Sequence, residues 1–179
     1  MIDKTLEELR YPTGKWVKVA NPDAATRAAM IAAVADVPAA LSRALAGLTD
    51  VQLDAPYRPG GWSPRQIVHH LADSHMNAFI RLKLGLTEDN PTIKPYEEQT
   101  WADTPDGRDT PVALSMSIIE GLHARWAHLL RSLDTTAFDR TIQHPERGPM
   151  SLCDLLQLYA WHGNHHTVQV LQMRERMGW

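Results

Sequence analysis

Cysteine is nearly absent from this chain, since Cys153 is the one cysteine among 179 residues. A single thiol excludes an intrachain disulfide and a zinc site built from several thiolates, and it fits a reducing compartment. An excess of basic residues is also missing, because 18 Lys and Arg stand against 21 Asp and Glu and give a net charge of −3. Without a basic excess to neutralise phosphates, nucleic acid is not an expected partner.

Long apolar runs are missing as well. The longest extends from Ala28 to Ala35, which is too short to span a bilayer. The first eleven residues are charged and lack the apolar region of a signal peptide, so we expect a cytoplasmic protein without a membrane partner. The hydrophobic content of 44% can build one core at this length. We therefore expect a single domain over residues 1–179, with residues 1–20 as an N-terminal extension.

No segment shows a sustained alternation of apolar and polar residues, which is the signal of a half-buried strand. Capping residues, first-turn prolines and helical periodicity instead predict four long helices, at about 22–46, 64–86, 111–133 and 152–177. Asn21 is the expected N-cap of the first helix, and Pro38 is expected to kink or split it. The prediction is an all-α fold, a four-helix bundle with long connections.

The connection from Thr87 to Asp109 is unusually long for a compact domain and is rich in Pro, Thr, Asp and Asn. We expect it to fold back over the second helix as a lid on a substrate site, with Trp101 contacting substrate. The alternatives are a plain surface loop or a dimer contact anchored by Trp101. Residues 144–149 are expected to form a further loop.

What the sequence does contain in quantity is histidine, with nine in all. His162 and His166 are four residues apart on the last helix, so their side chains share one face. That face also carries four core-type residues: Leu155, Tyr159, Val170 and Met173. The pair could therefore bind a metal ion, or it could be two core histidines satisfied by hydrogen bonds. Gly163 between them indicates a close approach by another helix or a ligand.

A third ligand would have to come from another helix, and the second helix offers His69, His70 and His75. His70 begins a polar stripe that continues through Asp73, Ser74, Asn77 and Arg81. Such a stripe is either the wet face of the helix or the lining of a polar cleft. In a cleft, Asp73 could support a ligand or act as a base, and Asn77 and Arg81 could bind a distal part of a substrate. His123 and His128 on the third helix are expected at the surface or its boundary.

Two motifs make a specific resemblance. The first motif is Gly60-Gly61-Trp62-Ser63 leading to Val68-His69-His70-Leu71-Ala72-Asp73, and the second is Trp161-His162-Gly163-Asn164-His165-His166. Together they closely resemble the DinB superfamily and, within it, the YfiT-like branch. The resemblance extends from about residue 11 to residue 179. It implies a four-helix bundle with unusual connections, frequent homodimers, and one divalent ion per chain, zinc or nickel. Its three metal ligands fall on His70, His162 and His166, whereas His69 and His165 are not expected to bind metal.

The resemblance and the chemistry leave three functions open. A three-histidine ion keeps an open position, where it can ionise a thiol or lower the pKa of a bound water. We expect S-transfer of a low-molecular-weight, bacillithiol-like thiol, because this branch is linked to it and thiolate attack needs no separate base. The first alternative is a metal-dependent hydrolase that uses metal-bound water, and the second is a non-catalytic, stress-related metal-binding module.

Overall fold

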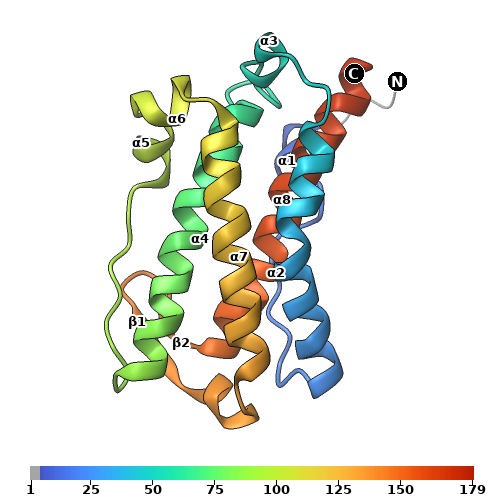
Figure 1. The fold of residues 1–179 in the computed structure, drawn as a ribbon. Coiled ribbons are helices and arrows are strands. Elements are labelled where there is room, and N and C mark those ends of the chain that lie inside the picture. The colour runs from blue at the N-terminus through green and yellow to red at the C-terminus, as the bar shows by residue number, and fades with distance from the viewer. Residues whose placement is uncertain (1–4) are drawn as a thin grey trace.

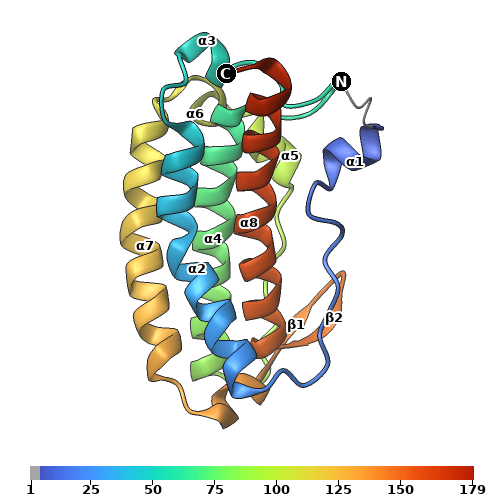
Figure 2. The same cartoon turned by 90° about the vertical axis from the view of Figure 1, so that its right-hand side faces the viewer.

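The computed structural model describes residues 5–179. Within that range, the predicted bundle is confirmed: the long helices α2 (Ala24–Leu45), α4 (Pro64–Thr87), α7 (Val112–Ser132) and α8 (Leu152–Met177) pack side by side (Figures 1 and 2). Helices α2 and α4 each pack against both α7 and α8. Shorter elements complete the fold: α1 (Leu6–Arg10), α3 (Asp50–Leu53), α5 (Glu98–Ala102), α6 (Pro105–Asp109), η1 (Thr135–Asp139), β1 (Thr141–His144) and β2 (Gly148–Ser151).

The helix starts follow the capping residues of the sequence. Ser63 and Ser151 each form the predicted reciprocal capping box with the residue three positions later. The first helix differs, because Asp23 rather than Asn21 is its N-cap and accepts a hydrogen bond from the Thr26 amide. Pro38 does not split α2, which is helical without a break across it.

The order of helix directions explains the long connection before α7. Helices α2 and α8 run one way, whereas α4 and α7 run the other way (Figure 1). Because α4 and α7 are packed neighbours that run in the same direction, the chain must return along the length of α4 between them. A helix of 24 residues is about 36 Å long, so the return needs an extended segment of many residues. This return segment, residues 88–111, is therefore long for a topological reason.

The prediction of an all-α fold is incomplete at one place. Strands β1 and β2 form an antiparallel hairpin with Thr141 opposite Ser151 and His144 opposite Gly148, where the sequence indicated a loop. Each strand has four residues, which is too short to show an alternating pattern. Gly148 supports the turn with a φ of 75°, in the left-handed region that favours glycine. The hairpin also bonds to the return segment, since the Ile93 amide donates to the Gln143 carbonyl.

Gly163 lies at a close contact between α8 and α2. A Cβ atom at this position would lie 2.5 Å from Cγ2 of Val37, which is much closer than side-chain atoms pack. The glycine that the sequence marked as a sign of close approach therefore faces a neighbouring helix. Gly163 lies between His162 and His166 in the sequence, so the close contact with α2 is at the level of these two histidines.

Helix α2 differs from the sequence prediction in one further respect. It is long and apolar enough to cross a membrane by length and composition, although no uninterrupted apolar run reaches that length. A core helix of a bundle passes the same test, and Val34, Val37 and Leu41 are buried here between neighbouring helices. The composition of α2 is therefore weak evidence for a membrane span.

The described part of the N-terminal extension lies against α8 (Figure 2). Lys18 forms an ion pair with Asp154 at 2.8 Å, and the Val19 amide donates to Oε1 of Gln157. Farther along α8, Nε1 of Trp161 donates to the Gly14 carbonyl. Residues 5–20 are thus tied to the bundle by specific contacts, whereas residues 1–4 of the expected extension lie outside the described residues.

Candidate metal centre

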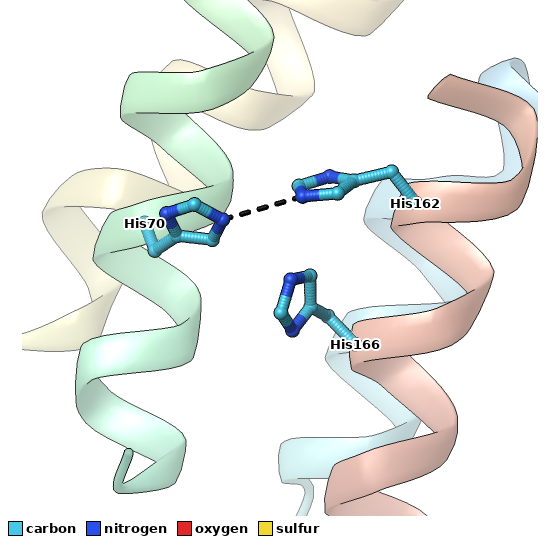
Figure 3. A group of neighbouring side chains, drawn as sticks. All are labelled: His70, His162 and His166. Atoms are coloured by element: carbon cyan, nitrogen blue, oxygen red, sulfur yellow. Dashed lines mark hydrogen bonds between the residues drawn. The ribbon is translucent and has the colours of Figure 1, made fainter. Parts of the chain in front are cut away.

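The structure brings together the three histidines expected to bind a metal. His70 points from α4 towards α8, and His162 and His166 point back from successive turns of α8 (Figure 3). One ring nitrogen from each residue can be chosen so that all three lie within 4.8 Å of one another. The Nε2 atoms of His70 and His162 are 3.3 Å apart. Two ligands at about 2.0–2.1 Å from a tetrahedral zinc ion would be about 3.3–3.4 Å apart, so this pair fits an ion without rearrangement.

Burial keeps these three imidazoles neutral. Desolvation lowers the pKa of His70 to about 3, and it lowers the pKa of His162 and His166 well below the usual value. For His162 and His166, the other nearby imidazoles lower the pKa further. A histidine must be neutral to offer a lone pair to a metal ion, so the ligand set is in the required protonation state at neutral pH.

The outer nitrogens of the two α8 histidines are held by hydrogen bonds. Nδ1 of His166 lies 2.8 Å from Oε1 of Gln169, whose amide nitrogen donates to the Arg10 carbonyl. Because that oxygen can only accept, His166 donates from Nδ1 and leaves Nε2 free for a metal ion. Nδ1 of His162 lies 3.1 Å from Nε2 of His75, which the sequence did not distinguish from an ordinary helix residue.

His123 corrects an expectation about the third helix. It is 1% exposed rather than a surface or boundary residue, and its Nε2 lies 2.8 Å from Nδ1 of His75. Its own Nδ1 lies 2.6 Å from the Val34 carbonyl on α2. The sequence pattern missed this role because a single histidine on a long helix carries no sign of its partner on another helix. His128 is exposed as expected.

His69 and His165 lie beside ligands in the sequence but outside the three-histidine group. His69 bonds to the Ser115 hydroxyl at 2.7 Å and to the Thr110 carbonyl at 3.0 Å, on the side of α4 that faces α7. His165 contacts the Thr13 hydroxyl through Nδ1, and its ring stacks on Trp161 with centroids 4.5 Å apart. Both rings therefore have other partners, and neither belongs to the three-histidine group.

The three histidines open into a cavity of about 440 Å³. Trp62 covers one side of the cluster, with its ring centroid 4.5 Å from that of His70. Nε1 of Trp62 donates to Gln99 at the start of α5, which ties the return segment to this wall. Tyr159 forms part of another wall, where its hydroxyl lies 3.4 Å from the Ser74 hydroxyl. The centre is accessible to a small molecule, as a catalytic rather than a structural site requires.

Among the residues expected to bind substrate, Arg81 lines this cavity, whereas Asn77 and Trp101 do not. The Asn77 amide bonds back to the Asp73 carbonyl on its own helix. Trp101 is 42% exposed and packs on Tyr96, with ring centroids 4.5 Å apart. The return segment does run along α4, but it reaches the cavity through Glu98 and Gln99. Trp101 is not among the residues that line the cavity, so its role as a lid stays a prediction.

Asp73 does not line the cavity either. It is half-buried, and desolvation, followed by the nearby carboxylate of Asp106, raises its pKa to about 6. Within the part of the chain that the structure describes, Glu98 is the one carboxylate residue that lines the cavity. Burial raises the pKa of Glu98, while Arg147 and Arg81 oppose that rise. Helical spacing could not find Glu98, because it belongs to the return segment rather than to the His70 stripe.

Comparisons with known proteins agree with this geometry. Residues 24–170 match the family model described as the DinB superfamily. A protein of Geobacillus thermodenitrificans (strain NG80-2), named "Putative metal-dependent hydrolase", is 50% identical over 177 residues, which cover 98% of this chain and 99% of the relative. A protein of Bacillus mycoides (strain KBAB4), also named as a "Putative metal-dependent hydrolase", is 46% identical over 174 residues, covering 97% of this chain and 100% of the relative.

A solved structure is similar over the whole fold. YfiT from Bacillus subtilis superposes with a TM-score of 0.94 at 42% sequence identity, covering 96% of this chain and 99% of that one. It is described as "a probable metal-dependent hydrolase with an unusual four-helix bundle topology". The likeness therefore includes both the helices and the connections between them.

Proposed function

This chain belongs to the DinB superfamily, and from that premise we propose that it is a metal-dependent hydrolase with His70, His162 and His166 as its metal ligands. The observation that supports this most directly is the convergence of three neutral imidazoles at one end of an accessible cavity. The names of the relatives favour the hydrolase alternative over thiol S-transfer, the function expected first from the sequence. They also favour an enzyme over a non-catalytic binding module.

A bound divalent ion, for which zinc and nickel are our first candidates, would supply Lewis acidity and lower the pKa of a water molecule to about 7. The protein's own contribution is to hold three ligands and leave one side of the site open to the cavity. Glu98 is our candidate for the proton acceptor, because it is the carboxylate among the described residues that lines the same cavity. Burial raises the pKa of Tyr159, so its phenol stays protonated and can donate a hydrogen bond to a substrate oxygen.

The test is turnover of p-nitrophenyl esters by metal-loaded protein, with and without an added low-molecular-weight thiol. We expect nitrophenol release that needs the metal, does not need the thiol, and is lost in His162→Ala. Glu98→Gln should lower the turnover while the metal content stays the same. Product that forms only with the thiol, as a thioester, would instead support S-transfer. No metal-dependent product under either condition would count against an enzyme of either kind.

A further inference from the structure

Four arginines converge on the cavity that contains the metal centre. Arg10 comes from α1, Arg58 from the connection before α4, Arg81 from α4 and Arg147 from the hairpin turn. With Glu98 as the opposing carboxylate among the described residues, the lining has a formal excess of three positive charges. The chain as a whole has a net charge of −3, so positive charge is concentrated at this one place.

None of these four guanidinium groups forms an ion pair with a carboxylate among the described residues. Among residues 5–179, the ion pairs made by arginines involve Arg43 and Arg65, which lie outside the cavity. Arg81 is buried, and the bond from its Nη2 to the Lys94 carbonyl uses one of its five donors. Arg58 donates to the Tyr57 hydroxyl and the Pro59 carbonyl, both of which are neutral acceptors. A buried guanidinium without an anionic partner is costly, which indicates that a ligand provides the partner.

Arg81 and Arg147 act at the same end of the cavity, although they come from different elements. Both lower the pKa of His144, which burial already depresses. Both also act on Glu98, but neither forms an ion pair with it within the described structure. Arg81 lies eleven residues after His70 on α4, or about 16 Å along the helix axis. A ligand that reaches both ends of the cavity must therefore be extended.

We propose that the cavity binds an extended small molecule with a carboxylate or phosphate group, which the guanidinium groups hold while its reacting bond lies at the three histidines. This inference rests on the proposed function in treating the cavity as a substrate site. Arginine suits the task because its planar fork donates two parallel hydrogen bonds to either kind of oxyanion.

The test measures binding of inorganic phosphate and of succinate by calorimetry, with metal-loaded and chelator-treated protein. Binding that persists after chelation is due to the arginines rather than to the ion. Because the binding measurement involves no hydrolysis, it tests this proposal independently of the turnover that tests the proposed function. Arg81→Gln and Arg147→Gln should each weaken binding about tenfold, as expected for the loss of a charge-assisted hydrogen bond. The preferred probe distinguishes a phosphate ligand from a carboxylate ligand.

Arg43→Gln is the matched control, because Arg43 is an exposed arginine paired with Asp36 on α2. It should bind both anions as the unmodified chain does. Arg147 is exposed at a hairpin turn, so its variant stays informative if Arg81→Gln fails to fold. The proposal is overturned if neither anion binds saturably, or if Arg147→Gln binds as tightly as Arg43→Gln.

A second inference comes independently from the hydrogen-bond chain behind His162. The Val34 carbonyl can only accept, so His123 donates to it from Nδ1. A neutral His123 then accepts at Nε2 from Nδ1 of His75, and His75 in turn accepts at Nε2 from Nδ1 of His162. Each hydrogen bond thus determines the tautomer of the next histidine. The last one leaves Nε2 of His162 without a proton, 3.3 Å from Nε2 of His70.

We infer that His75 and His123 are positioning residues, which select the Nδ1–H tautomer of His162 and aim its free Nε2 at the metal position. The chain ends on the backbone of α2, so three helices define the orientation of one ligand. His75 and His123 are both buried, so the chain of hydrogen bonds is shielded from solvent. Partners of this kind typically change metal affinity 10- to 100-fold when they are removed.

The tautomer can be read directly from the imidazole ¹⁵N chemical shifts of the unmodified protein, where Nδ1 of His162 should carry the proton. His75→Phe should lower the affinity for Zn²⁺ about 10- to 100-fold. His75→Gln should keep most of it, because its amide offers both an acceptor and a donor. His69→Phe is the control, since His69 is also buried and hydrogen-bonded on α4. A proton on Nε2 of His162, or equal affinities in His75→Phe and His69→Phe, would refute the inference.

Discussion

Replacing His162 with alanine is expected to lower the affinity for Zn²⁺ by roughly a hundred- to a thousandfold. Zinc held by four protein ligands gains roughly 10–16 kcal/mol, or about 2.5–4 kcal/mol for each ligand. His70→Ala and His166→Ala should have effects of the same size, because the three nitrogens form one compact group. Elemental analysis after dialysis against buffered zinc measures the occupancy, and competition with a chromogenic chelator measures the affinity.

The controls for this prediction are the two histidines adjacent to ligands. His69 precedes His70 and His165 precedes His166, yet both bond to other partners. His69→Ala and His165→Ala should therefore keep close to one ion per chain, even if they lower the melting temperature. Full occupancy in His70→Ala would show that the third ligand lies elsewhere.

Acid is expected to destabilise the metal-free protein steeply, and the free energy of unfolding should fall by at least about 3 kcal/mol between pH 7.5 and 5.5. Burial lowers the pKa of His70 to about 3 and of His165 to about 4, and it lowers the pKa of His75, His162 and His166 well below normal. In the unfolded chain each titrates near 6.5, so below that pH the unfolded state binds more protons than the folded state. His70 and His165 therefore each cost about 1.4 kcal/mol over this interval, and the other three histidines add to the loss in the same direction.

Urea unfolding at a series of pH values measures this loss. A chelator should be present, so that release of metal by protonated ligands does not add to it. His165→Asn should reduce the loss by about 1.4 kcal/mol, because one depressed group is removed. His128→Gln is the matched control, since that histidine is exposed and lies outside the buried histidine cluster. A free energy of unfolding that stays constant down to pH 5.5 would show that the histidines are not buried as described.

The sequence predicted the helices well, because their signals are local. The capping boxes at Ser63 and Ser151 depend on residues three positions apart, and both occur in the structure. Helical spacing also placed His162 and His166 on one inward face. The hairpin at 141–151 was missed because its strands are short, and the N-cap shifted from Asn21 to Asp23 because both residues suit that position.

The role of the return segment could not be predicted from local sequence signals. Its length indicated a lid, but the length follows from two neighbouring helices that run in the same direction. Glu98 and Gln99 line the cavity, whereas Trp101 does not. Asp73 does not line it either, although it lies one turn from His70. Spacing along one helix predicts the direction of a side chain. Which residues that side chain contacts depends on how the other elements pack against the helix.

The sequence by itself determined an amphipathic helical fold, the shared face of His162 and His166, and a resemblance that pointed to His70. These follow from the 3.6-residue period and from motifs a few residues long. Tertiary structure decided the rest: the link from His162 through His75 and His123 to Val34, and the meeting of Arg10, Arg58, Arg81 and Arg147 in one cavity. Those residues are far apart in the chain, and a hydrogen bond or a charge cluster between them exists only after the bundle has set their distances.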